Sequence, residues 1–66
     1  MLYYIDMTGK QVLDLLKKNG WVLDRIHGSH HVMVKDGFPP LSVPVHGPKD
    51  LKTGTLHSIL KTAGLK

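Results

Sequence analysis

Apolar residues at helical spacing dominate the first part of the chain. Those within Val12–Leu16 would form one buried stripe of a helix, and the charged residues around them lie mostly off it. Thr8 and Gln11 match a capping box, in which each side chain pairs with the backbone N–H of the other residue. Asn19-Gly20 tolerates the left-handed backbone that ends many helices. The pattern therefore predicts an amphipathic helix from Thr8 to Asn19-Gly20.

After Gly20 the pattern changes to short segments of the kind that form strands. Turn-forming residues separate these segments, with Gly28-Ser29 after the first, and Asp36-Gly37 and Pro39-Pro40 after the second. The predicted strands are Trp21–Ile26, His31–Lys35 and Leu41–His46. Trp21 opens the first strand, which we expect to be half-buried, and its indole is predicted to lie in the core.

Side-chain alternation predicts the faces of two of these strands. The second strand has an apolar face formed by Val32 and Val34. The residues that alternate with these two are expected on the open face of the sheet: His31, Met33 and Lys35. The third strand turns its apolar residues inward: Leu41, Val43 and Val45. Because Pro44 cannot donate a ladder hydrogen bond, this strand is predicted to lie at a sheet edge.

A second helix is predicted near the C-terminus, after a loop at Gly47–Lys52. Apolar residues recur at helical spacing from Leu56 to Ala63, and Gly64 supplies a stop. The order helix, three antiparallel strands, helix defines an α+β fold with both helices on one face of the sheet and the other face open to a partner. We expect the whole chain of 66 residues to form one domain, with its core at about 7–65.

Composition limits the classes of protein to which the chain can belong. The absence of cysteine excludes a disulfide-stapled scaffold and a thiolate zinc site. No apolar run is long enough to span a bilayer and no secretory signal is evident, so we expect a soluble, cytoplasmic protein without membrane contact. The net charge of +4 favours a polyanionic partner such as RNA. Met1–Asp6 is either an upstream extension or a short added strand.

The candidate chemistry centres on Gly28-Ser29-His30-His31. RNA carries its own nucleophile, the 2′-OH, so a protein can cleave it without a metal or cofactor by moving protons and stabilising the phosphate. An imidazole, with an unperturbed pKa of about 6.5, suits this task near neutral pH. The small residues of the loop allow a phosphate to approach the backbone closely. The cations within plausible reach are Arg25, Lys35, Lys49 and Lys52.

Several separated motifs occur together in the order of one known family. They are Gly20-Trp21, Gly28-Ser29-His30-His31, Pro44-Val45-His46, Leu51–Leu56 and Ile59–Leu65. From about Met7 to Leu65 the chain thus resembles the HicA family of bacterial toxins. The resemblance implies an mRNA interferase with a fold similar to double-stranded-RNA-binding domains, one essential histidine and no metal. It also implies an antitoxin of the HicB family that covers the site.

The resemblance maps the essential histidine to His30, which directly follows Gly-Ser, and leaves His31 as a competitor. Strand alternation favours His31, whereas the Gly-Ser break lets His30 escape strict alternation. We therefore expect His30 to be the general acid or base, with His31 assisting. The residues predicted to bind RNA are Gly28, Ser29, Arg25, Lys35, His46, Lys49 and Lys52. His27 is interpreted as a solvated residue, and His57 as a surface residue of the last helix.

Two other functions are compatible with the same pattern. A non-catalytic double-stranded-RNA-binding module has the same order of elements, and it would bind duplex RNA with steep salt dependence but would not cut it. A protein-interaction subunit would use the open sheet face and would not bind RNA. A metal site is disfavoured because adjacent histidines on a strand point apart and no acidic cluster accompanies them.

Overall fold

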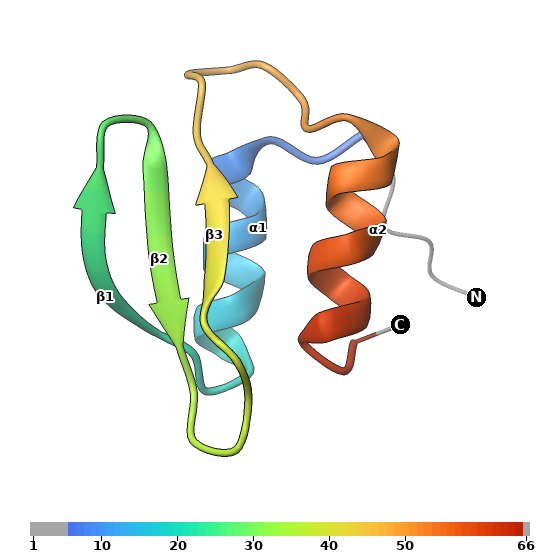
Figure 1. Ribbon diagram of the computed structural model, residues 1–66. Helices are drawn as coiled ribbons and strands as arrows, with labels where there is room; N and C mark the ends of the chain where they lie inside the picture. The colour runs from blue at the N-terminus through green and yellow to red at the C-terminus, as the bar shows by residue number, and fades with distance from the viewer. Residues whose placement is uncertain (1–5, 66) are drawn as a thin grey trace.

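A computed structural model describes residues 6–65 as a three-stranded antiparallel sheet packed against two helices. The elements are α1 (Gly9–Lys18), β1 (Val22–His27), β2 (His30–Val34), β3 (Leu41–Pro44) and α2 (Thr53–Thr62). The strands lie in the order β1-β2-β3, and both helices lie on the same side of the sheet (Figure 1). The predicted α+β fold and the edge position of β3 are confirmed. The expectation for Met1–Asp6 falls on residues 1–5, which lie outside the described part.

Both ends of α1 have the predicted caps. The Thr8 backbone N–H donates to Gln11 Oε1 at 2.9 Å, and the Gln11 N–H donates to Thr8 Oγ1 at 3.2 Å. At the other end Gly20 has a φ of +91°, and the Trp21 N–H donates to the Leu16 carbonyl at 3.0 Å. This C-terminal turn leads directly into β1, so it sets where the hairpin of β1 and β2 begins.

The core lies between the sheet and the two helices. Its buried apolar residues are Val12, Leu13, Leu16, Trp21, Met33, Leu41, Val43, Leu56, Ile59, Leu60 and Ala63. Trp21 is only 2% exposed, and its ring centroid lies 5.4 Å from that of Phe38, so its predicted core position is confirmed. Neither helix in the described residues is long and apolar enough to cross a membrane.

A two-residue turn joins β1 and β2. His27 and His30 are direct cross-strand partners, so the loop consists of Gly28 and Ser29 alone. Gly28 has a φ of +58° and Ser29 has no positive φ, which is the pattern of a type II′ turn with glycine at its first central position. The strands therefore extend closer to the turn than predicted. At the other edge, β3 ends at Pro44 and not at His46.

The predicted faces of β2 are wrong. Met33 is completely buried on the helix side, and its cross-strand partner Leu41 is buried as well. Because cross-strand partners share a face and alternate residues of one strand do too, His31 also lies on the helix side, opposite Val43. His30 lies on the open face. Alternation alone could not identify the inner face because both faces of β2 contain apolar residues, and the buried residues of β3 decide it.

The strand β1 is more exposed than predicted. All six of its residues are exposed, and the strand packs mainly against β2. The register shifts between Leu23 and Arg25, so a bulge interrupts the pairing there. The helices pack behind β3, which lies at the opposite edge of the sheet from β1 (Figure 1). The first strand is therefore an open edge that carries the hairpin turn, not the half-buried strand that its apolar content suggested.

Candidate active site

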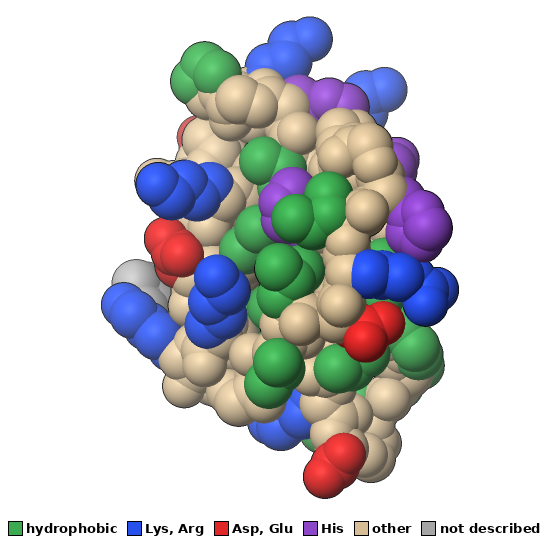
Figure 2. Space-filling model, turned by 90° about the vertical axis from the view of Figure 1, so that its left-hand side faces the viewer, with side chains coloured by type: hydrophobic (Ala, Val, Ile, Leu, Met, Phe, Trp, Pro, Cys, Tyr) green, Lys and Arg blue, Asp and Glu red, His purple; other side chains and the backbone are tan. Residues whose placement is uncertain are grey.

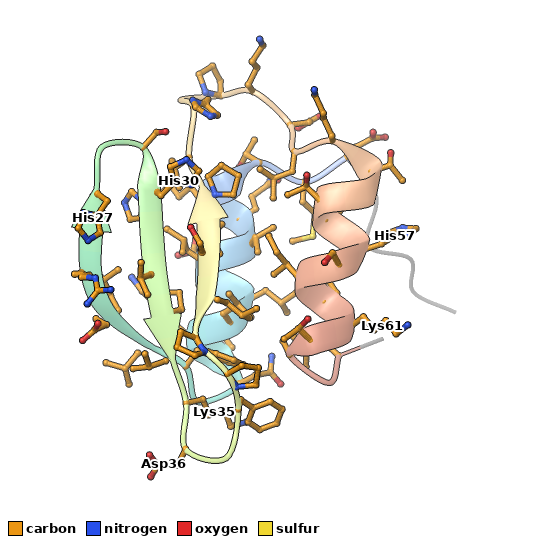
Figure 3. All side chains as sticks on the ribbon, viewed as in Figure 1. His27, His30, Lys35, Asp36, His57 and Lys61 are labelled. Carbon is orange, nitrogen blue, oxygen red and sulfur yellow. The ribbon has the colours of Figure 1, made fainter. Side chains whose placement is uncertain are left out.

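His30 lies on the open face at the start of β2. Its side chain is exposed, and Ser42 Oγ on β3 lies 3.2 Å from its Nδ1, within hydrogen-bonding distance (Figure 3). A partner at one ring nitrogen restricts the orientation of an imidazole and influences which nitrogen carries the proton. Because Ser42 engages Nδ1, Nε2 is the nitrogen that a bound substrate would meet.

Cross-strand pairing places two more polar residues on this open face. His27 is the partner of His30, and Arg25 is the partner of Val32. The Arg25 guanidinium lies 3.7 Å from the Asp24 carboxylate, but both side chains are exposed and such a pair is weak. Arg25 can therefore turn to a phosphate at little cost. Figure 2 shows histidine side chains close to a basic side chain along one edge of the molecule.

The hairpin turn gives a substrate close access to the backbone. Nothing lies within 4 Å of the position that a Cβ on Gly28 would occupy. On its inner side the turn is fixed, because the Ser29 carbonyl accepts a hydrogen bond from the Val45 N–H at 2.7 Å. The tip that carries the two histidines is thus held to the segment after β3, while its outer side remains open.

His31 lies on the other side of the sheet from His30. Its side chain is partly buried, and its Nδ1 is buried without a hydrogen-bond partner among the described residues. Its cross-strand partners, Ile26 and Val43, are both apolar. We therefore interpret His31 as a packing residue, since a substrate on the open face cannot reach its ring through the sheet.

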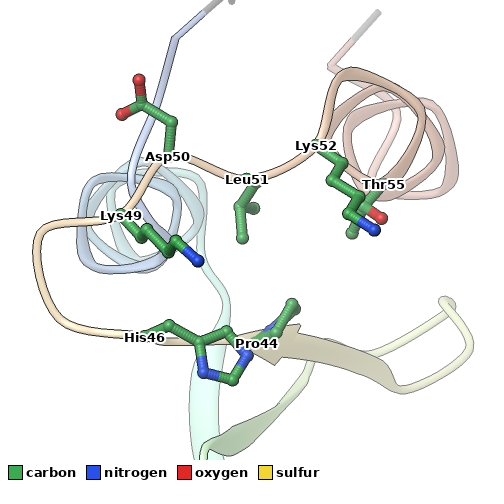
Figure 4. A pocket seen from close by; sticks show the side chains of 7 residues that line it. All are labelled: Pro44, His46, Lys49, Asp50, Leu51, Lys52 and Thr55. Carbon is green, nitrogen blue, oxygen red and sulfur yellow. The ribbon is translucent and has the colours of Figure 1, made fainter.

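A cavity of about 470 Å³ opens between the end of β3 and the start of α2. It is lined by Pro44, His46, Lys49, Asp50, Leu51, Lys52 and Thr55. In the close view of Figure 4 the Lys49 and His46 side chains extend toward the hollow, whereas the Asp50 carboxylate points away from it. The N-terminus of α2 adds the positive end of a helix dipole. This combination of basic side chains and dipole favours an anionic occupant.

The cavity adjoins the surface around His30. Pro44 lines the cavity and is also the cross-strand partner of His30. The predicted RNA-binding residues therefore fall into two adjoining groups. Around His30 are Gly28, Ser29 and Arg25. Around the cavity are His46, Lys49 and Lys52.

Lys35 lies apart from both groups. It directly follows the last residue of β2, whereas His30 is the first residue of that strand. Its ammonium donates a hydrogen bond to the Asn19 carbonyl oxygen at 2.7 Å and lies 5.1 Å from the centre of the Phe38 ring. A cation in this position stabilises the C-terminal end of α1. The position of Lys35 thus does not support its predicted role as an RNA contact beside the histidines.

His27 is a member of the candidate site that the sequence did not identify. The sequence led us to interpret it as a solvated residue, just after the first predicted strand. The signal that identifies it is the length of the loop, since Gly-Ser is a typical two-residue hairpin turn and the residues flanking such a turn face each other. With that turn assigned, His27 and His30 become cross-strand partners on one face.

The described residues contain no group of three or more His, Asp or Glu side chains that could hold a metal ion. His27 and His31 have the four-residue separation that brings two ligands together on a helix. Here they lie in a hairpin and on opposite faces of the sheet, because His31 is paired with Ile26 on the inner face and His27 with His30 on the outer face. On the outer face the hairpin therefore brings together two imidazoles, those of His27 and His30.

Comparison with known proteins defines the class of this chain as a bacterial toxin. Residues 9–65 match the family model of the HicA toxin of bacterial toxin-antitoxin systems, and the chain belongs to this family. It is also similar to a solved structure described as a toxin-antitoxin complex from Streptococcus pneumoniae. That match has a TM-score of 0.78 and 37% sequence identity, and it covers 89% of this chain and 98% of the other. None of the curated proteins matches.

Proposed function

We propose that this HicA-family toxin is an endoribonuclease that cleaves mRNA without a metal ion. The observation that carries the proposal is His30, an exposed imidazole held by Ser42 beside an accessible turn. Arg25 shares its face, and the basic cavity adjoins it. An exposed proton carrier surrounded by cations suits phosphodiester cleavage, and a toxin that destroys mRNA inhibits translation.

Cleavage by this route requires two proton transfers at one phosphodiester. A base removes the proton of the 2′-OH, whose oxygen attacks the neighbouring phosphorus, and an acid protonates the 5′-oxygen as its bond to phosphorus breaks. The products are a 2′,3′-cyclic phosphate and a 5′-hydroxyl. His30 performs one of these transfers through Nε2, and Arg25 stabilises the additional negative charge on the phosphate in the transition state.

The RNA chain on either side of the reacting phosphate is held by the remaining predicted residues. The backbone of Gly28 and Ser29 lies open to the phosphate at the turn. Beyond Pro44 the RNA passes over the cavity, where Lys49, Lys52 and His46 contact its next phosphates. Binding through phosphates alone fixes the position of the RNA but carries no direct sequence information.

We further propose that a HicB-type antitoxin neutralises the toxin in the cytoplasm by covering the open sheet face. Two observations support such a partner. The chain resembles HicA toxins, and the similar Streptococcus pneumoniae structure is described as a toxin-antitoxin complex. An acidic partner surface would complement the net charge of +4 and would compete with RNA for the same cations.

The proposal predicts that the purified protein cuts labelled RNA in the presence of excess chelator, at the same rate as in magnesium buffer. The reason is that the 2′-OH and the protein's own imidazole supply the nucleophile and the proton transfer. Gel analysis of single-stranded and duplex RNA at low salt measures both binding and cutting. Binding of duplex RNA without new ends would instead favour the non-catalytic module, and cutting that stops on chelation would reject the metal-free route.

Replacing His31 with leucine is expected to leave cleavage intact and to raise the free energy of unfolding by about 1 kcal/mol, because it removes a buried nitrogen without a partner. Chemical denaturation and the RNA cleavage assay measure the two effects. Leucine fits the apolar neighbours Ile26 and Val43 on the inner face. A folded His31→Leu variant without cleavage activity would show that His31 is itself required for cleavage.

A further inference from the structure

We propose that His27 is the second proton-transfer group of the site and acts with His30 on the same phosphodiester. The inference rests on the proposed ribonuclease function and extends it, because cleavage requires both a base and an acid and a single imidazole supplies only one of them at a time. His27, which the sequence indicated to be a solvated surface residue, would then be a catalytic residue. No other exposed titratable group in the described residues is paired directly across the sheet with His30.

The register of the hairpin places the two histidines on one face. They are direct cross-strand partners that flank the turn, so their Cβ atoms lie about 4.5 to 5.5 Å apart and point to the same side of the sheet. The contact of the His30 ring with Ser42 draws it toward β3, whereas His27 stands on the outermost strand (Figure 3). A phosphate bound on the open face beside the turn can therefore be approached from both strands.

The surroundings of His27 fit a group that works on a phosphate. Its side chain is exposed, and the turn beside it leaves the backbone of Gly28 accessible. The charged and titratable groups that share its face are His30 on β2 and Arg25 on β1, whose guanidinium is close to the Asp24 carboxylate. From β3 the neighbouring group is Ser42, through its contact with His30. Arg25 can hold the phosphate while the two imidazoles move protons.

In the reaction one imidazole begins neutral and the other begins protonated. The neutral ring takes the 2′-OH proton while the 2′-oxygen forms its bond to phosphorus. The protonated ring gives its proton to the 5′-oxygen, whose bond to phosphorus breaks, so the cyclic phosphate and the 5′-hydroxyl leave with charge conserved. Each ring then holds the protonation state of the other, and exchange with water restores the starting state.

The test compares rate–pH profiles of the complete protein and of two variants on one labelled RNA under single-turnover conditions. The wild-type profile is expected to be bell-shaped, since it requires one neutral and one protonated imidazole. His27→Gln is expected to lower the maximal rate about 100-fold, the lower end of the range for a lost acid or base, and to abolish one limb of the bell. The limb that disappears identifies the role, because loss of the base removes the acidic limb and loss of the acid removes the alkaline limb.

His27→Lys separates proton transfer from simple phosphate binding. Lysine keeps a positive charge but does not exchange protons near neutral pH, so this variant is expected to be as slow as His27→Gln. A wild-type rate and profile in His27→Lys would overturn the inference and leave His27 as a cationic contact. His57→Gln on α2 is the matched control that keeps the wild-type profile, because His57 lies on the helix side of the molecule, away from the open face (Figure 3).

The same assay distinguishes failure of this inference from failure of the proposed function. If the wild-type protein cuts RNA and His30→Gln does not, while His27→Gln retains the bell-shaped profile, the ribonuclease function stands and the role of His27 is wrong. If the wild-type protein cuts no RNA in any buffer, both are wrong. Thermal unfolding of each variant checks that a loss of rate does not reflect a loss of the fold.

Discussion

Replacing His30 with glutamine is expected to lower the rate of RNA cleavage by a factor of about 10² to 10⁴, the range measured for loss of a general acid or base. Glutamine is polar and of similar length, so it can still face Ser42 and bind water on the open face. It cannot exchange a proton near neutral pH. The substitution thus removes the chemical step and preserves the exposed surface, because the His30 side chain is outside the core.

The rate constant is measured under single-turnover conditions at fixed salt, and RNA affinity is measured in parallel. We expect affinity to change little, since Arg25 and the cavity lysines remain, and growth arrest on expression of the toxin to be lost. His57→Gln serves as the control for replacing a histidine outside the site. Unchanged cleavage by a folded His30→Gln protein would remove the chemical basis of the proposed function.

The second large effect is on stability. Replacing Gly9 with alanine is expected to lower the free energy of unfolding by about 3 kcal/mol, at the upper end of the usual range for overpacking. A Cβ at this position would collide with the Pro44 carbonyl oxygen and would lie 2.9 Å from the Val45 Cα. These atoms belong to the backbone, so a change of side-chain rotamer cannot relieve the contact. A chain of this length has a total stability of about 3 to 10 kcal/mol, so the loss amounts to between about a third of that stability and all of it.

Gly54→Ala is the matched control in the other helix. Nothing lies within 4 Å of the Cβ position at Gly54, and this glycine has no positive φ. Alanine is the better helix former, so the variant is expected to gain about 0.5 to 1 kcal/mol. Urea denaturation followed by circular dichroism measures both changes. A Gly9→Ala protein as stable as wild type would show that α1 does not press closely against the end of β3.

This contact also matters for the site. The segment that Gly9 supports contains Pro44, the partner of His30, and Val45, whose N–H holds the Ser29 carbonyl of the hairpin turn. The close approach of α1 to the end of β3 therefore positions the turn from behind. Any Gly9→Ala molecules that remain folded are expected to have impaired cleavage, although no atom of Gly9 faces the open side.

The helices and the order of elements could be predicted from the sequence because local rules determine them. Thr8 and Gln11 form their capping box within one turn, and Gly20 and Gly64 end the two helices with positive φ angles. The edge position of β3 followed from Pro44, which cannot donate a ladder hydrogen bond. In each case the deciding interaction lies within a few residues of the signal.

The composition of the site could be predicted only in part because it depends on register and packing. Alternation in β2 left two choices of inner face, and the buried Leu41 and Val43 of the neighbouring strand made the choice. This result places His30 on the open face and removes the earlier reason to prefer His31. The position of Lys35 depended on the end of α1, which no pattern within the strand encodes.

The lining of the cavity at the start of α2 could not be predicted from the sequence, although its basic residues were predicted to bind RNA. Lys49 and Lys52 lie in a loop without regular periodicity, and their meeting with His46 depends on how that loop crosses between β3 and α2. The Asp50 backbone pairs with Thr8 in an isolated bridge, which ties the loop to the start of α1. Such contacts between distant segments leave no local signal.

The most direct test of the central claim is cleavage of an RNA with a single 2′-deoxynucleotide on the 5′ side of the mapped cleavage position, in the presence of chelator. We expect the all-RNA substrate to yield a 5′-hydroxyl and a 2′,3′-cyclic phosphate, and the deoxy substrate to remain uncut at that bond because it lacks the nucleophile. Cleavage at the deoxy position, or products with a 5′-phosphate, would contradict metal-free cleavage through the 2′-OH.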